Sequence, residues 1–198
     1  DFIDHLDPLS KSTMSVNCIN FHKGIVKGYN TDIYGFENLI RVNNVDMNSK
    51  NILVLGAGGG AKAVCFYLKS CRYNFYIYNR SELKAEELSR LLFNDTSCAL
   101  NKNESIKNID IVINCLPRSI EPFDFLNKSC IEISDLSYFI DINYNTKFSK
   151  LNGVKVESII NGIDMLIYQA IKSNEIWLGT NILDRLDVKY IKENLTEN

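Results

Sequence analysis

The sequence predicts an α/β fold: a doubly wound parallel sheet preceded by a smaller α/β piece. Beyond residue 50, short apolar runs of strand length alternate with amphipathic runs of helix length. The apolar runs are continuous rather than alternating, which is typical of strands buried on both faces. A glycine-rich turn directly follows the first of these runs. Together these observations favour strand–helix–strand units over an all-helical or all-β chain.

The first part of the chain is expected to form a small piece of sheet. Residues 2–12 are predicted to be the end of a helix. Residues 16–21 and 25–27 are predicted to pair as a hairpin around Lys23-Gly24, because a glycine here separates two apolar runs.

A helix is predicted to follow the hairpin. Thr31 or Asp32 would cap its start, and apolar side chains recur on one face as far as about Val42. The polar stretch 43–50 then makes a suitable boundary, because the chain changes character after it.

The remaining elements alternate, as a parallel sheet requires. Strands are predicted at residues 51–55, 74–78, 97–100, 109–114, 138–142 and 155–157. Helices are predicted at residues 61–70, 81–93, 161–173 and 182–195.

Composition excludes several classes of function. With 22 basic and 24 acidic residues the net charge is −2, so no nucleic-acid partner is expected. No run approaches the ~18 apolar residues of a membrane span, so no membrane partner is expected either. The 6 cysteines include no C-x-x-C pair and there are only 2 histidines. This predicts reduced thiols in a cytoplasmic protein and no metal site.

The glycine turn carries the first functional signal. The strand at 51–55 runs into Gly56-Ala-Gly-Gly-Gly-Ala61, which fits G-x-G-x-x-[G/A]. Gly56 allows a tight turn, Gly58 lets a pyrophosphate approach the backbone, and Ala61 lets the helix pack closely on the strand. The alternative is a flexible turn, which does not account for successive glycines between two well-formed elements. A Rossmann-like dinucleotide site is therefore predicted at Gly56, Ala57, Gly58, Gly59 and Gly60.

The end of the second strand predicts which dinucleotide is bound. An acid usually stands there to accept from the ribose 2′-hydroxyl of NAD. This chain has Asn79, Arg80 and Ser81 instead, with Lys84 one turn further on. Because Arg80 can hold a 2′-phosphate through two hydrogen bonds, NADP is the expected cofactor. The alternative is that Arg80 and Lys84 form an ordinary solvated face.

Several segments, in order, resemble the shikimate dehydrogenase family. Gly28-Tyr-Asn-Thr-Asp-Ile-Tyr-Gly-Phe36 is similar to its G-x-N-T-D-x-x-G-F signature. The glycine loop and Asn79-Arg-Ser-Glu-Leu-Lys-Ala85 resemble its cofactor segments. Further matches are Asp110-Ile-Val-Ile-Asn114, Asn161-Gly-Ile-Asp-Met-Leu-Ile-Tyr-Gln-Ala170 and Glu175-Ile-Trp-Leu-Gly179. The resemblance implies NADP-dependent, reversible reduction of 3-dehydroshikimate to shikimate in aromatic amino acid biosynthesis.

The resemblance also implies residue roles. Asn17 and Asp32 would hydrogen-bond the substrate hydroxyls, and Asp32 would be the carboxylate of a catalytic Lys–Asp pair. Tyr144 and Gln169 would line the substrate pocket. Ile142 and Gly162 would lie along the nicotinamide half of the cofactor.

The family spacing puts the lysine partner of Asp32 shortly before Asp1, in a substrate domain of which most is absent here. A chain without that lysine is expected to bind NADP but to turn over shikimate poorly or not at all. Met14-Ser-Val-Asn-Cys18 and Cys115-Leu-Pro117 also depart from the family pattern.

The resemblance implies three segments. They are the C-terminal part of the substrate domain with a linker helix (1–43), the NADP-binding domain (44–180) and a closing helix that packs back toward the substrate domain (181–198). The alternatives are a quinate/shikimate dehydrogenase using NAD or NADP, a non-catalytic NADP-binding module, and one segment of a larger multifunctional polypeptide. A homodimer is one oligomeric state that the sequence leaves open.

Overall fold

The computed structural model describes residues 2–101, 103–104, 106–133, 135–144 and 154–196. The chain divides into two compact units. Unit one joins residues 1–43 to residues 163–198, and unit two comprises residues 44–162. The three-segment division expected from the sequence stays a prediction.

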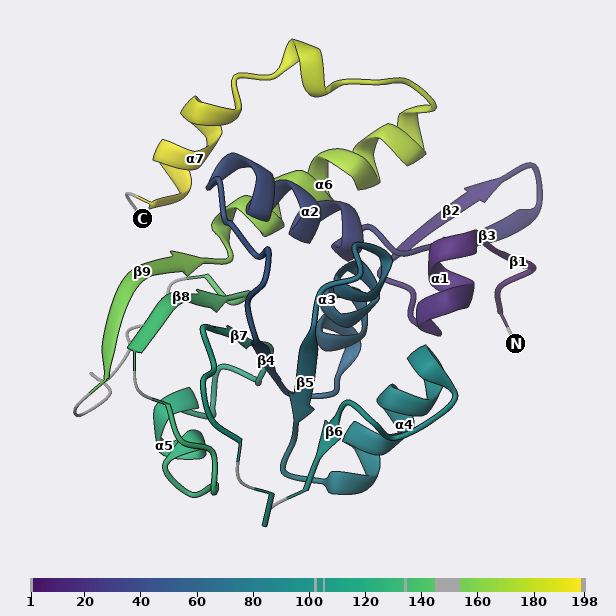
Figure 1. Ribbon diagram of the computed structural model, residues 1–198. Helices are drawn as coiled ribbons and strands as arrows, with labels where there is room; N and C mark the ends of the chain where they lie inside the picture. The colour runs from purple at the N-terminus through teal and green to yellow at the C-terminus, as the bar shows by residue number, and fades with distance from the viewer. Residues whose placement is uncertain (1, 102, 105, 134, 145–153, 197–198) are drawn as a thin grey trace. The chain divides into compact units, whose positions relative to one another are not determined.

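Unit two is built on a parallel sheet of six strands, which run from β9 at one edge to β6 at the other (Figure 1). In chain order the strands are β4 (Ile52–Leu55), β5 (Phe75–Tyr78), β6 (Ala99–Leu100), β7 (Ile111–Asn114), β8 (Asp135–Asp141) and β9 (Lys155–Asn161). The spatial order is β6-β5-β4-β7-β8-β9. The predicted α/β class and doubly wound order are therefore confirmed, and the direction of strand order reverses between β4 and β7.

The central strands of this sheet are buried on both faces. Every residue of β4 and β7 is buried, as their continuous Ile, Leu and Val runs predicted. Leu53 and Leu55 join a core cluster with Phe123, Leu126 and Phe139. The alternate residues of β4 point to the opposite face. Both faces therefore need cover, and connecting helices supply it.

The described residues of unit two form three helices, α3 (Gly59–Ser70), α4 (Glu82–Phe93) and α5 (Pro122–Leu126). The first two confirm the predicted helices. No element was predicted at α5, which is short. It begins at a proline, and the Glu121 carboxylate accepts a hydrogen bond from the Asp124 N–H at 2.6 Å. Its apolar side chains Phe123 and Leu126 complete the core cluster.

Unit one contains a three-stranded sheet in the order β1-β3-β2. Its strands are β1 (His5–Leu6), β2 (Cys18–His22) and β3 (Ile25–Tyr29). Its helices are α1 (Pro8–Thr13), α2 (Asp32–Val42), α6 (Ile163–Leu178) and α7 (Val188–Thr196), with a 3₁₀ turn η1 at Leu183–Arg185. The predicted hairpin and the helix ending at Val42 are confirmed.

The prediction that residues 2–12 form the end of one helix was wrong. This stretch contains strand β1, which pairs in parallel with β3, and then the new helix α1. Asp7 starts that helix, because its carboxylate accepts from the backbone N–H of Ser10 at 2.9 Å and of Leu9 at 3.3 Å. Pro8 follows at the first helical position, where the missing N–H costs nothing.

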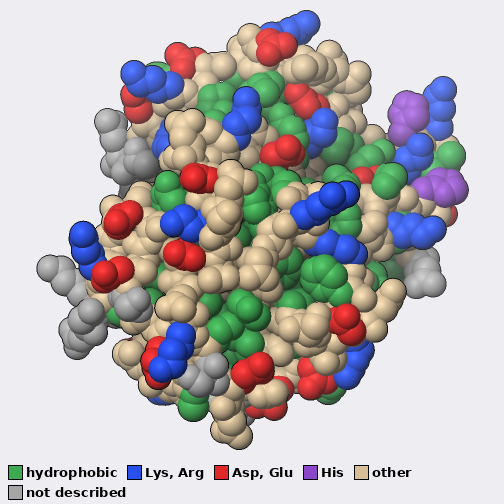
Figure 2. Space-filling view, viewed as in Figure 1, with side chains coloured by type: hydrophobic (Ala, Val, Ile, Leu, Met, Phe, Trp, Pro, Cys, Tyr) green, Lys and Arg blue, Asp and Glu red, His purple; other side chains and the backbone are tan. Residues whose placement is uncertain are grey.

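The surface mixes charges of both signs. Lys, Arg, Asp and Glu side chains are interspersed over the face shown in Figure 2. Among the described residues, no helix is long and apolar enough to cross a membrane.

Candidate functional site

The glycine loop lies where the strand order of unit two reverses. Gly56 directly follows Leu55, the last residue of β4. Cys115 directly follows Asn114, the last residue of β7, and Leu55 and Asn114 are paired in register. Gly56 has a φ of 105°, and a Cβ there would come within 2.9 Å of the Cys115 carbonyl oxygen. Only glycine fits both the backbone conformation and the space.

A groove with a volume of about 280 Å³ opens at this point. A Cβ on Gly58 would meet nothing within 4 Å, so this residue presents bare backbone to open space. Gly58 is also the N-cap residue of α3, whose first turn contains Gly59 and Gly60. The amides of that turn favour a negatively charged group. The groove therefore suits the approach of a pyrophosphate.

The second predicted segment lines the same groove. Its four residues, Asn79, Arg80, Ser81 and Lys84, lie along the wall together with Gly56, Ala57 and Gly58. The Asn79 side-chain amide donates to the Ser81 carbonyl at 3.0 Å and so braces the turn that carries Arg80. The structure thus brings the glycine loop together with two cationic side chains and no carboxylate in the described lining.

The opposite wall of the groove was not among the predicted site residues. It consists of Cys115, Leu116, Pro117 and Ile120. Their signal is positional, because they follow the strand paired with β4 on the far side of the reversal. Burial raises the pKa of the Cys115 thiol, and the Asp141 carboxylate adds to that effect. Cys115 is therefore an uncharged wall residue rather than a nucleophile.

Ile142 and Gly162 meet beside the glycine loop. A Cβ on Gly60 would lie 2.6 Å from Ile142 Cδ1, so this side chain covers the start of α3. A Cβ on Gly162 would lie 1.9 Å from the Ile142 carbonyl oxygen, which leaves room for glycine alone. Tyr144 follows in the same segment, with the Arg118 guanidinium 4.0 Å from the centre of its ring.

Unit one holds a separate cluster of polar side chains. Asn17 Nδ2 donates to Asp32 Oδ1 at 2.7 Å and to Gln169 Oε1 at 3.4 Å. These residues come from the segment before β2, the start of α2 and the middle of α6. The fold therefore brings together three of the four predicted substrate residues, while Tyr144 belongs to the other unit.

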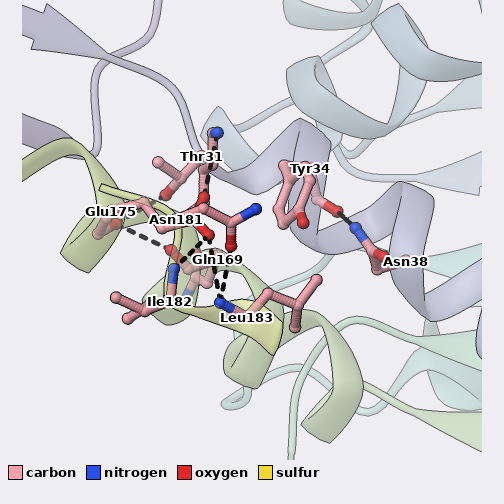
Figure 3. Close-up of polar contacts among 10 residues, drawn as sticks. Thr31, Tyr34, Asn38, Gln169, Glu175, Asn181, Ile182 and Leu183 are labelled. Atoms are coloured by element: carbon pink, nitrogen blue, oxygen red, sulfur yellow. Dashed lines mark hydrogen bonds and ion pairs between the residues drawn. The ribbon is translucent and has the colours of Figure 1, made fainter. Parts of the chain in front are cut away.

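Residues not predicted as part of the site hold this cluster in place. Thr31 donates to Asn17 Oδ1 from its backbone N–H at 2.8 Å and from its hydroxyl at 3.3 Å. Thr31 is the N-cap residue of α2, in line with the prediction, but its side chain makes no capping bond. The Asp32 N–H donates instead to Asn30 Oδ1 at 3.1 Å. Ser173 lies 3.1 Å from the Thr31 hydroxyl and donates to the Gln169 carbonyl at 2.9 Å. Figure 3 shows Thr31 and Gln169 in this part of unit one.

The Asp32 carboxylate is half-buried. Desolvation raises its pKa above the usual value for an aspartate, and the hydrogen bond from Asn17 opposes that rise. A carboxylate with a raised pKa holds and releases a proton closer to neutral pH than an exposed one. This property suits a group that takes part in proton transfer.

The end of α6 is fastened by one carboxylate. Glu175 accepts from the backbone N–H of Ile182 at 3.2 Å and of Leu183 at 3.4 Å, which folds the chain back after the helix (Figure 3). Burial works against ionisation here. The hydrogen bonds from Ile182, Lys172 and Leu183 nevertheless lower the Glu175 pKa.

No group of three His, Cys, Asp or Glu side chains that could hold a metal ion occurs among the described residues. A glycine loop at the reversal of a parallel sheet, with cations beside it, defines a dinucleotide-binding protein.

Comparison with known proteins identifies the family. Residues 38–159 match the model of the shikimate / quinate 5-dehydrogenase family. The chain is 34% identical over 192 residues to the NADP(+) shikimate dehydrogenase of Methanococcus maripaludis, covering 90% of this chain and 67% of that protein. The chain belongs to the shikimate / quinate 5-dehydrogenase family.

Solved structures agree with this assignment. A chorismate mutase/shikimate 5-dehydrogenase fusion protein from Clostridium acetobutylicum superposes with a TM-score of 0.73 at 27% identity, covering 99% of this chain and 72% of that one. A shikimate dehydrogenase in complex with NADP+ has a TM-score of 0.68 at 27% identity, covering 90% of this chain and 66% of that one.

Proposed function

We propose that this chain is part of an NADP-dependent shikimate dehydrogenase, which interconverts 3-dehydroshikimate and shikimate. The observation that carries the proposal is the groove in which the glycine loop, Arg80 and Lys84 line one cavity. Family membership supports the reaction, because the matched relatives are named for it. Bound NADPH would supply a hydride to the ketone carbon of the substrate.

The residues of the groove fit NADP. The backbone at Gly58 has open space for a pyrophosphate, and Arg80, which lines the same groove, is the proposed partner of the 2′-phosphate. An acid at the end of β5 would repel that phosphate, and Asn79 stands there instead. The role of Ile142 and Gly162 beside the nicotinamide half is part of this proposal.

Asp32 is the proposed proton-handling group of unit one. Asn17 holds its carboxylate, and burial raises its pKa. Reduction of a ketone produces an alkoxide that needs a proton, and a positioned acid lowers the barrier to that transfer. Asn17, Asp32 and Gln169 present both donors and acceptors, which suits the hydroxyl groups of a polyol substrate. Tyr144 is proposed as a further substrate contact.

Quinate is the second candidate substrate, because the family description includes it. Comparing shikimate with quinate at equal concentration, with NADP+ and then NAD+, separates the two activities. A non-catalytic module would bind NADP and oxidise neither compound.

All six cysteines carry free thiols, so we also propose a cytoplasmic location. A homodimer remains an expectation that sedimentation would test.

Arg80→Ala tests the cofactor assignment. Removing the guanidinium should weaken NADP binding at least about tenfold and leave NAD binding within about twofold, because only NADP carries the 2′-phosphate. Calorimetric titration measures both affinities. Arg90→Ala is the matched control, since Arg90 pairs with Glu86 at 3.0 Å elsewhere on α4. An NADP-to-NAD affinity ratio that Arg80→Ala leaves unmoved would contradict the assignment.

A further inference from the structure

A buried carboxylate lies at the carboxyl ends of β7 and β8. Asp141 is 0% exposed, and its Oδ1 accepts from Asn114 Nδ2 at 2.9 Å. The same oxygen accepts from the backbone N–H of Asn143 at 3.0 Å and from Asn143 Nδ2 at 2.9 Å. One carboxylate oxygen thus joins the last residue of one strand to the segment that leaves its neighbour.

The bonding continues into the wall of the groove. Asn114 Oδ1 accepts from the Leu116 N–H at 3.1 Å, and Asn143 Nδ2 donates to the Leu116 carbonyl at 3.1 Å. Leu116 lines the groove beside Gly56. Asp141, Asn114 and Asn143 therefore tie the segment after β8 to the groove wall after β7.

Burying such a polar cluster costs free energy, so its presence at this position needs a reason other than stability. Taking a carboxylate out of water is unfavourable, and a well-packed apolar side chain is often at least as stabilising at a buried position. What a fully bonded polar cluster gives instead is one defined arrangement of the segments that it joins. Ile142 is flanked by two members of this cluster and has little freedom to move.

Ile142 is held from its other sides too. Its Cδ1 packs against Gly60 at the start of α3, and its carbonyl lies against Gly162. The Gly162 N–H donates to the Asn143 carbonyl at 2.9 Å, which brings the end of β9 into the same arrangement. Ile142 thus stands over the glycine loop as a rigid apolar wall.

We infer that Asp141 is a positioning residue which, through Asn114 and Asn143, holds Ile142 as the wall against which the pyridine-ring half of the dinucleotide packs. This inference rests on the proposed NADP site and assigns a role to the residues behind it. Asp141 acts on the ligand through Ile142. Its loss should therefore weaken the part of the affinity that comes from the nicotinamide half, and spare the part that comes from the 2′-phosphate half.

The test compares NADPH with 2′-phospho-ADP-ribose, which lacks the nicotinamide. Asp141→Asn keeps the size of the side chain and removes its charge, which weakens charge-assisted hydrogen bonds. We expect NADPH affinity to fall about tenfold and 2′-phospho-ADP-ribose affinity to change less than about twofold. Arg80→Ala is the matched control and should weaken both ligands alike. Calorimetry measures the affinity of each ligand for the unmodified chain and for both variants.

Asn143→Ala keeps the test informative if Asp141→Asn does not fold. This variant loses the side-chain bonds to Asp141 and Leu116 but keeps the backbone bond, so the same selective loss should occur in milder form. Equal losses for both ligands, or no loss for either, would overturn the role of Asp141 while leaving the NADP site intact. Failure of the unmodified chain to bind either ligand would overturn the NADP site itself, and the inference with it.

Discussion

The candidate sites of the two units differ in whether backbone or side chains form them. In unit two the glycine loop of the groove is formed by backbone: Gly56 turns the chain at a φ of 105°, and Gly58 lines the groove without a side chain. In unit one the polar cluster is formed by side chains, with Asn17 bridging Asp32 and Gln169. A backbone site depends on where side chains are absent. A side-chain site depends on distant residues that the fold brings together.

This difference decides which substitutions do harm. Adding a single methyl group at Gly56 or Gly162 of unit two forces atoms into occupied space. Removing a functional group from the cluster of unit one leaves the packing nearly unchanged and alters charge. We therefore expect large steric effects in the first region and small electrostatic effects in the second.

Gly162→Ala should have the largest effect. The new Cβ would lie 1.9 Å from the Ile142 carbonyl oxygen and 3.0 Å from that of Asn143, so the ends of β8 and β9 must separate. Overpacking and backbone strain of this kind cost about 1–3 kcal/mol or more. The free energy of unfolding in urea should fall by at least about 2 kcal/mol, and NADP binding should weaken with it. An unchanged urea midpoint would contradict the tight approach at Gly162.

Gly58→Ala is its counterpart in the same frame and should separate binding from stability. A Cβ there meets nothing within 4 Å, and the φ of −84° is open to alanine. The unfolding free energy should stay within about 0.5 kcal/mol of the original. NADP affinity should nevertheless fall about tenfold, because the methyl group projects where the pyrophosphate approaches. Normal binding by a folded Gly58→Ala chain would show that the pyrophosphate lies elsewhere.

The sequence was informative wherever a local pattern reports a local constraint. Four glycines between two apolar runs predicted the turn at Gly56, because the steric reason lies within a few residues. Helix α5 was missed because its five residues are too few for a periodic pattern. The helix predicted at residues 2–12 included β1, because a two-residue strand is too short to show an alternation of apolar and polar residues.

The polar cluster of unit one lay beyond such reasoning without the family resemblance. The hydrogen bond between Asn17 and Gln169 spans 152 positions, and no spacing in the sequence encodes that pairing. Asn30 and Ser173 were overlooked for the same reason, since each acts through a neighbour that only the fold supplies. Buried clusters such as that of Asp141 also give no local signal, because the sequence shows a polar residue at the end of a strand and nothing more.

Asp32→Asn should have the smallest effect on stability. The sign of its change in melting temperature tests the contrast between the units. Desolvation raises the Asp32 pKa in the folded chain, so ionisation of this group opposes folding. The contribution of Asp32 to the stability of the folded chain is most favourable below the unfolded-state pKa of about 3.9. It is lost as the pH rises through the folded-state pKa. At pH 7 the neutral asparagine should therefore raise the melting temperature slightly, and the gain should shrink toward acidic pH.

Asp46→Asn supplies the matched control in unit two, with the opposite sign. Asp46 Oδ1 accepts from the Asn48 backbone N–H at 3.0 Å and from Asn48 Nδ2 at 2.9 Å, and these bonds lower its pKa. Its contribution is present above the unfolded-state pKa and is lost as pH falls through the folded-state value. Asp46→Asn should thus lower the melting temperature at pH 7. At acidic pH the melting temperatures of the variant and the original chain should become equal. Calorimetric melting of both variants from pH 3 to pH 8 checks the two signs. Parallel pH dependence in the two variants would mean that Asp32 is not desolvated, and would remove the physical basis for its proton-handling role.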